Sequence, residues 1–370
     1  MRPYFPLLTV LLFATLPVHA GVVQTLTARL EGKVVLDKDH IAIGEKKIPW
    51  AEVLYLLPDS ATRTVVHSQR VVLKSGETWA VELLALADGK LEVRSDLFGV
   101  KKIDVGLISS IDFRIPPGAA TERKTGTLYR VKGEPVRGKL LAITKDKAVV
   151  DSAVGELEFA RPTLAGYRFA DVAASTSKGE DEVVLVDGSV LRGKLALAAD
   201  GLKLEHAVLG PVALPAAALR SVVRHPAQML DLIELTPQSV QTTLVLATEK
   251  SNSTLRTILS PERESARFIK GLVCEPKTEI VYKLPKMDGK KGRLRALLGP
   301  IAGAQGDVRV KIQAGKKVLV DRELVASAKV EMIELDVMGG DELAISVDFG
   351  ARLRFPCGIV LGDPHVLWEP

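Results

Sequence analysis

The chain has 370 residues, with 50 Lys and Arg against 45 Asp and Glu, and a formal net charge of +5 at pH 7. The basic residues are spread along the chain and not gathered on one element, which argues against a nucleic-acid-binding protein. Aromatic residues make up only 5% of the sequence, which argues against the aromatic-rimmed cleft of a glycosidase.

Residues 1–20 are predicted to be a cleavable signal peptide. Arg2 supplies a positive start, Phe5 to Pro17 is an almost unbroken apolar run, and Val18-His19-Ala20 puts small residues where a signal peptidase cuts. The run is shorter than the roughly 20 apolar residues that span a bilayer, although an uncleaved N-terminal anchor is the alternative. We therefore expect an exported protein, periplasmic or extracellular, whose mature chain starts near Gly21 and has no transmembrane segment.

The region that follows repeats one unit. Its clearest sign is a constant offset of 55 residues, which places Gly133, Gly138 and Gly155 on Gly188, Gly193 and Gly210. A shorter copy comes first, because Leu30–Val34 is similar to Leu191–Leu195. The repeat predicts four β units, over residues 21–68, 69–114, 126–170 and 181–225.

Each unit is expected to contain about five short strands. Asp187-Gly188 and Ser75-Gly76 are hairpin turn signals between alternating segments, and Pro215–Val223 fits one helical turn that leads into a strand. The pattern V-x-L-x-D-G-x-x-L-x-G-x-L resembles that of Sm-like small barrels, which implies small-barrel geometry. RNA binding is not carried over, because the chain has an export signal. A four-bladed propeller is the alternative arrangement.

The last part of the chain, residues 229–370, resembles the NPCBM family, the "novel putative carbohydrate-binding module" of exported bacterial proteins. The matching segments, in the order of the family, are Asp231–Pro237, Lys270–Leu284, Arg295–Gly299, Gly306–Val310 and Gly362–Trp368. The resemblance implies a jelly-roll β-sandwich of the galactose-binding type that binds a glycan or polysaccharide. Alternating apolar strands, such as Leu343–Phe349, agree with a sandwich.

Few residues in this module offer a sugar contact. Tyr282 and Phe349 alternate with apolar neighbours and are expected in the core. Phe355 and Trp368 remain as exposed candidates, because sugar rings stack on aromatic side chains. The candidate ligand-binding residues are therefore Asp363, His365, Trp368 and Phe355.

Cys274 and Cys357 are the only two cysteines, and an even pair in an exported chain predicts a disulfide. No pair of histidines or cysteines has metal-ligand spacing, so we expect no catalytic metal and no cofactor. A structural Ca²⁺ is an option at five aspartates at or near strand ends: Asp307, Asp321, Asp336, Asp341 and Asp348.

No nucleophile elbow, P-loop or H-E-x-x-H motif is present, so we expect that the protein is not an enzyme. The sequence predicts an all-β, exported binding protein, with repeated small β units followed by a carbohydrate-binding sandwich. The alternative is a scaffolding protein of the bacterial cell envelope, in which the repeats and the sandwich bind other envelope proteins.

Overall fold

The computed structural model describes residues 21–58, 68–114, 123–171, 180–243, 256–259, 268–287 and 289–369, with the backbone alone for 256–259. The predicted signal peptide lies outside these residues. In the described ranges, regular structure consists of strands and four three-residue 3₁₀ turns, which confirms the all-β class. None of the helices in these ranges is long and apolar enough to cross a bilayer.

The first 21 strands form four units, numbered here in chain order. Unit 1 contains β1 (Gly21–Thr25), β2 (Arg29–Gly32), β3 (Val34–Leu36), β4 (His40–Ile43), β5 (Lys46–Pro49), η1 (Trp50–Glu52) and β6 (Val53–Leu57). Unit 2 contains β7 (Gln69–Leu73), β8 (Thr78–Ala87), β9 (Lys90–Ser95), β10 (Gly99–Asp104), η2 (Val105–Leu107) and β11 (Ile108–Asp112).

Units 3 and 4 follow the same order. Unit 3 contains β12 (Thr127–Arg130), β13 (Val136–Ile143), β14 (Lys147–Ser152), β15 (Gly155–Ala160), η3 (Arg161–Thr163) and β16 (Leu164–Arg168). Unit 4 contains β17 (Asp181–Leu185), β18 (Val190–Ala198), β19 (Gly201–His206), β20 (Gly210–Pro215), η4 (Ala216–Ala218) and β21 (Leu219–Val223).

In each unit the last strand returns to pair with the first. The pairs are β1·β6, β7·β11, β12·β16 and β17·β21, all antiparallel. A 3₁₀ turn precedes each last strand and redirects the chain toward the first. Closure of a unit into a small barrel stays a prediction.

The repeated glycines occupy matched backbone positions. A Cβ atom at Gly138 would lie 2.3 Å from the carbonyl oxygen of Asp151, and one at Gly193 would lie 2.3 Å from that of Glu205. Both glycines therefore lie where the neighbouring strand comes too close for any side chain. For this pair of glycines, the 55-residue offset seen in the sequence reflects a shared steric requirement.

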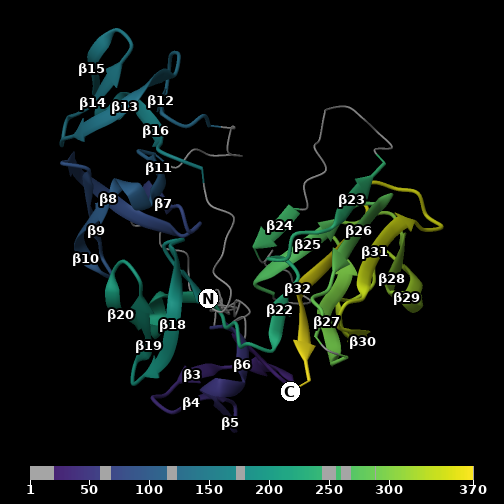
Figure 1. Cartoon of the computed structure of the whole chain (residues 1–370). Coiled ribbons are helices and arrows are strands. Elements are labelled where there is room, and N and C mark those ends of the chain that lie inside the picture. The colour runs from purple at the N-terminus through teal and green to yellow at the C-terminus, as the bar shows by residue number, and fades with distance from the viewer. Residues whose placement is uncertain are drawn as a thin grey trace, which may run out of the picture.

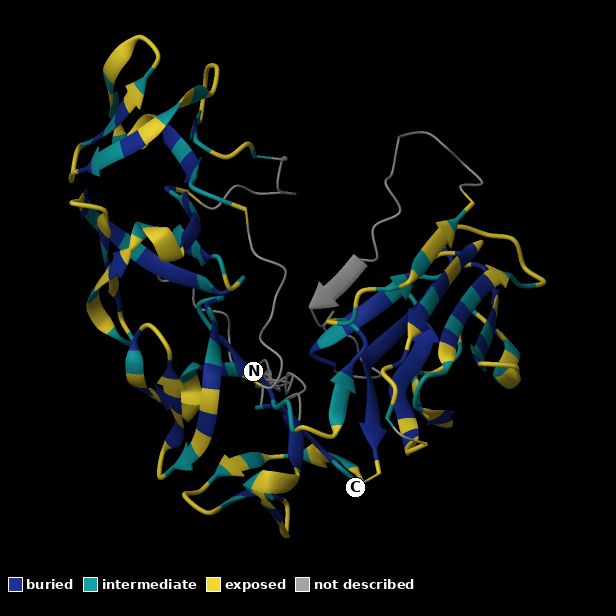
Figure 2. Cartoon of the chain, in the orientation of Figure 1, coloured by how far each residue is buried: buried dark blue, intermediate teal, exposed yellow. Residues whose placement is uncertain are grey.

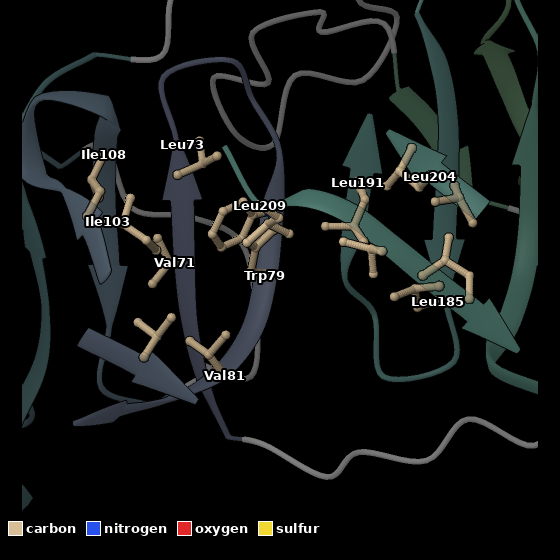
Figure 3. Close-up of a cluster of buried hydrophobic side chains, with 14 of the residues drawn as sticks. Val71, Leu73, Trp79, Val81, Ile103, Ile108, Leu185, Leu191, Leu204 and Leu209 are labelled. Atoms are coloured by element: carbon tan, nitrogen blue, oxygen red, sulfur yellow. The ribbon is translucent and has the colours of Figure 1, made fainter. Parts of the chain in front are cut away.

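The units do not follow chain order in space. Unit 1 pairs with unit 4 through β6·β21, unit 4 with unit 2 through β18·β8, and unit 2 with unit 3 through β11·β16. Figure 1 shows them in an open column in that order, with units 1 and 3 at opposite ends, unlike a closed propeller. One apolar core runs through the column, and Figure 3 shows part of it, including Trp79 of unit 2 and Leu191 of unit 4.

The remaining strands form a two-sheet sandwich. They are β22 (Met229–Asp231), β23 (Ser239–Thr242), β24 (Arg256–Leu259), β25 (Lys270–Cys274), β26 (Thr278–Lys283), β27 (Lys291–Pro300), β28 (Val308–Ala314), β29 (Lys317–Leu324), β30 (Glu331–Met338), β31 (Glu342–Phe349) and β32 (Ile359–Trp368). One sheet has the order β24-β25-β32-β27-β30, with β22 also paired to β32, and the other has the order β23-β26-β31-β28-β29.

The predicted disulfide between Cys274 and Cys357 is wrong. Both cysteines are free thiols buried in the core of the sandwich. Cys274 is in register with Ile359 of β32, so Cys357 lies two residues away from the position opposite it. Burial raises the pKa of the Cys274 thiol to about 12, and both residues act as small apolar side chains.

Candidate functional site

The predicted ligand-binding residues do not form an exposed site. Asp363, His365 and Trp368 lie on β32 and are 6%, 1% and 5% exposed, respectively. Phe355, at 51% exposure, lies outside that strand and packs edge-on against Phe349. Only Phe355 is therefore accessible to a ligand.

The burial of β32 comes from both of its faces. Trp368 points into the sandwich core and lies opposite Gly292, where a Cβ atom would be 2.6 Å from the indole ring. On the other face, Leu367 packs with Leu54 and Tyr55 of unit 1 in a separate apolar cluster. Figure 2 shows β32 as buried along its length.

Asp363 has a structural role at this interface. Its Oδ1 accepts the backbone N–H groups of Ile269 at 2.8 Å and Lys270 at 3.0 Å. Burial raises the pKa of the Asp363 carboxyl to about 7, even though those two hydrogen bonds and the charge of Arg29 lower it, and the nearby Asp231 raises it further. Such a group serves to satisfy buried amides.

His365 is held in its neutral form. Its Nδ1 donates to the carbonyl oxygen of Asp363 at 2.8 Å, and its ring lies 5.3 Å from that of Tyr55. Burial lowers the pKa of His365 to about 4. Its surroundings are therefore those of a packed interface residue and not of a proton donor.

A buried ion-pair network, which the sequence did not reveal, joins the sandwich to unit 4. Glu182 of β17 lies 2.7 Å from Lys270 Nζ and 2.8 Å from Arg192. Burial raises the pKa of Glu182, but the two cations outweigh that effect and lower it. Lys270 belongs to the segment that resembles the NPCBM family, yet nothing in the sequence marked Glu182 as its partner.

An open groove lies elsewhere, on the outer face of the five-stranded sheet. It has a volume of about 420 Å³. The lining residues come from all five strands or their immediate ends: Gln241, Thr243, Lys277, Thr278, Glu279, Arg309, Lys311, Asp321, Ser346, Val347 and Asp348. None of these described lining residues is aromatic.

Strand register arranges the polar side chains of the groove in a row. Gln241, Glu279, Ser346, Lys311 and Asp321 are consecutive cross-strand neighbours. Side chains alternate between the two faces of a strand. The along-strand neighbours of the row, such as Ile280 after Glu279 and Val310 before Lys311, are therefore buried in the core. The same alternation that builds the core therefore builds the groove.

Two ion pairs hold the groove side chains in place. Arg309 Nε donates to Asp321 Oδ1 at 2.8 Å, and Lys277 Nζ donates to Asp348 Oδ2 at 2.8 Å. The hydrogen bond from Arg309 lowers the pKa of Asp321, and the one from Lys277 lowers that of Asp348. Both carboxylates are therefore ionised acceptors at neutral pH.

The five aspartates considered for Ca²⁺ form no common cluster in the part of the chain that the structure describes. Asp321 and Asp348 are used in the ion pairs of the groove. Asp307 accepts the backbone N–H of Ala326 at 2.9 Å, and Asp341 accepts that of Met338 at 3.2 Å. These four aspartates stabilise turns or pair with cations, and Asp336 lies within β30.

No family model matches the chain, and no curated protein matches it. Solved structures similar to it include the CBM51 of Clostridium perfringens GH95 in complex with methyl-galactose, with 17% identity over 37% of this chain and 99% of that one, at a TM-score of 0.30. The tandem CBM51 modules of Streptococcus pneumoniae Sp3GH98 match at 12% identity over 52% and 71%, at a TM-score of 0.30.

A longer match is to Clostridium perfringens ZmpB, in a structure with its M60 catalytic domain and two CBM51 domains. The identity is 11%, over 83% of this chain and 32% of that one, at a TM-score of 0.32. At these identities and TM-scores the likeness gives no residue a role. Membership of the NPCBM family stays a prediction for residues 229–370.

Proposed function

We propose that the protein is an exported, non-catalytic glycan-binding protein, and that the glycan binds in the groove on the five-stranded sheet. The observation that carries this proposal is the row of polar side chains along the groove, which runs across all five strands. Sugar hydroxyls both donate and accept hydrogen bonds, so they need a surface that offers both kinds of partner at fixed positions.

The ion pairs prepare the groove for such a ligand. A carboxylate has two oxygens and a guanidinium has five N–H donors, so Asp321 and Arg309 keep further hydrogen-bonding capacity while they hold each other. Side chains that are already fixed lose less conformational entropy on binding. A sheet also positions these groups more rigidly than a loop would.

The charge balance of the groove favours a neutral glycan. Three cationic side chains line it (Lys277, Arg309 and Lys311), together with three acidic ones (Glu279, Asp321 and Asp348). The three carboxylates would repel a polyanionic glycan, and the three cations would neutralise only part of its charge. With no aromatic platform in the lining, affinity rests on hydrogen bonds, and we expect weak, hydroxyl-dependent binding.

The absence of a catalytic activity belongs to the proposal and has a physical basis. Glycoside hydrolysis commonly needs one carboxyl group that stays protonated as the general acid. Asp321 and Asp348 instead have lowered pKa values because each is hydrogen-bonded to a cation. These two groups are suited to accept hydrogen bonds from a sugar and not to donate a proton to it.

The proposal is tested by a glycan array with the mature chain, followed by titration of any hit into two variants. Lys311→Ala, between Ser346 and Asp321 in the row, should weaken binding about 10-fold, the equivalent of losing one good polar contact. Lys283→Ala is the matched control, because Lys283 lies on the same strand and face as Glu279 but outside the groove. The absence of binding to any glycan by a folded chain would refute the proposal.

A scaffolding role in the cell envelope is the second candidate. Two observations favour it: Trp368 is packed and not exposed, and the four units form an open column with apolar residues on the surface, such as Val100 and Val154. Capture of envelope proteins by a chain that binds no glycan, lost when Val154 is changed to Asp, would support this role instead.

A further inference from the structure

Three potential metal ligands meet where the repeats join the sandwich. His225 follows β21 of unit 4, Asp231 ends β22, and Glu234 lies three residues further along the chain. One ligand atom from each of these residues lies within 4.8 Å of the other two. No other group of this kind occurs among the described residues.

The orientation of His225 points to a ligand. Its Nδ1 donates to the carbonyl oxygen of Glu180 at 2.7 Å, because a carbonyl can only accept. Its Nε2 makes no hydrogen bond within the described structure, although the side chain is only 9% exposed, and it faces Glu234 Oε2 at 3.6 Å. A backbone carbonyl on the second ring nitrogen is the usual support of a metal-binding histidine.

The two carboxylates are also held in position. Asp231 Oδ1 accepts the backbone N–H of Ile233 at 2.8 Å, which fixes the orientation of the carboxyl group. Glu234 directs Oε1 toward Lys270 Nζ at 3.7 Å and Oε2 toward His225. Lys270 itself is anchored on Glu182 at 2.7 Å, and its contact with Glu234 is to Oε1 and not to the Oε2 that faces His225.

We propose that His225, Asp231 and Glu234 bind a divalent transition-metal ion, with Zn²⁺ as the best fit. Imidazole nitrogen and carboxylate oxygen are both zinc ligands, whereas Ca²⁺ takes oxygen ligands alone. Zinc–ligand bonds of about 2 Å place ligand atoms roughly 3.3 Å apart. Glu234 is the exposed member of the three, so it is free to close that distance, and water has access to the remaining position.

The position of the site gives the ion a structural role. His225 belongs to the end of unit 4, and Asp231 pairs with His365 of β32 in the sandwich. An ion bound by residues of unit 4 and of the sandwich would cross-link the segment between them and fix the orientation of the sandwich on the repeat units. This role is independent of glycan binding in the groove.

The test is calorimetric titration of Zn²⁺ into the mature chain after treatment with EDTA and buffer exchange. We expect one Zn²⁺ per chain, with at least 10-fold weaker binding in His225→Gln and in Glu234→Gln. Zn²⁺ should raise the melting temperature of the wild type and have a smaller effect on both variants. Glu234→Gln keeps the test valid if His225→Gln fails to fold, because Glu234 is at the surface.

His40→Gln is the matched control, since His40 Nδ1 lies 3.8 Å from a single carboxylate, that of Asp37. It should bind Zn²⁺ like the wild type. No saturable binding by the wild type would overturn the proposal, and so would equal affinity in the wild type, His225→Gln and Glu234→Gln.

Discussion

The two sheets of the sandwich differ in what covers their outer faces. The six-stranded sheet packs on the repeat units, so its strand β32 is buried at every position. The five-stranded sheet leaves its outer face to solvent, and β31 alternates between buried residues and residues with partial or full exposure. One outer face of the sandwich is therefore an internal interface, and the other is open to solvent.

The difference also explains why the shifted pKa values of Asp363 and His365 on β32 do not mark a functional site. Asp363 and His365 titrate far from their ordinary ranges because of burial, and both make backbone hydrogen bonds inside the interface. In the groove the carboxylates have lowered pKa values because of ion pairs. Perturbed titration is only a probabilistic sign of function, and for Asp363 and His365 burial accounts for it.

The largest expected effect is on the buried face. Trp368→Ala should reduce the free energy of unfolding by about 3–5 kcal/mol, because it removes a packed indole from the core. Phe355→Ala removes the exposed aromatic among the candidate ligand-binding residues, and it should reduce the free energy of unfolding by less than about 1 kcal/mol. Urea unfolding of the mature chain measures both. Equal losses in the two variants would contradict the assignment of Trp368 to the core.

A second effect concerns pH. The pKa of Asp363 is raised from 3.8 to about 7 in the folded chain, so the folded state keeps a proton that the unfolded state releases between these values. Its contribution to stability is present below pH 4 and is lost as the pH rises to 7, with a slope of at most about 1.4 kcal/mol per pH unit. Asp363→Asn should remove this slope from the unfolding free energy measured across that range. A slope unchanged in the variant would mean that other groups cause it.

A smaller effect tests whether the Asp363 side chain stabilises the fold as a hydrogen-bond acceptor. Asp363→Ala should cost about 1–3 kcal/mol, because the N–H groups of Ile269 and Lys270 lose their buried acceptor. Asp363→Asn retains an acceptor oxygen and tolerates the positive φ of 46° at this position. Thermal unfolding at pH 6 compares the two variants, and we expect Ala to be the less stable. An Asn variant as unstable as Ala would show that an acceptor oxygen alone does not satisfy the site.

The smallest effect is expected for reduction. Since Cys274 and Cys357 are free thiols, the melting temperature of the mature chain should be the same with and without dithiothreitol. Iodoacetamide should label neither thiol in the native protein and both after unfolding, because a buried thiol with a raised pKa carries little reactive thiolate. Labelling of fewer than two thiols after unfolding without reductant would contradict the free-thiol assignment and support a disulfide between Cys274 and Cys357.

Local sequence features predicted much of the fold. Gly138 and Gly193, at the 55-residue offset, mark a shared steric position, and the alternation of Leu343, Ile345 and Val347 marks one buried face of β31. These features depend on residues that are close together in the sequence, within one strand or one turn. For that reason they remain readable without any knowledge of the rest of the chain.

The sequence predicted neither the burial of His365 nor the groove, because the alternating pattern of a strand says which residues share a face, but not what covers that face. His365 looked accessible in the sequence, and it is buried because Tyr55 of unit 1 packs against it. The groove residues looked like ordinary surface charge, because Gln241 and Asp321 become members of one row only through the register of five strands.

Residue patterns were enough to predict the strands, the repeated turns and the all-β class, since these follow from periodicity and from the backbone needs of glycine. The spatial order of the units, the two free thiols, the buried C-terminal strand and the open groove became visible in the folded chain alone. Each of these depends on contacts between segments that are distant in the chain, such as Lys270 with Glu182. Such contacts are set by how whole sheets pack, and no local pattern of residues encodes them.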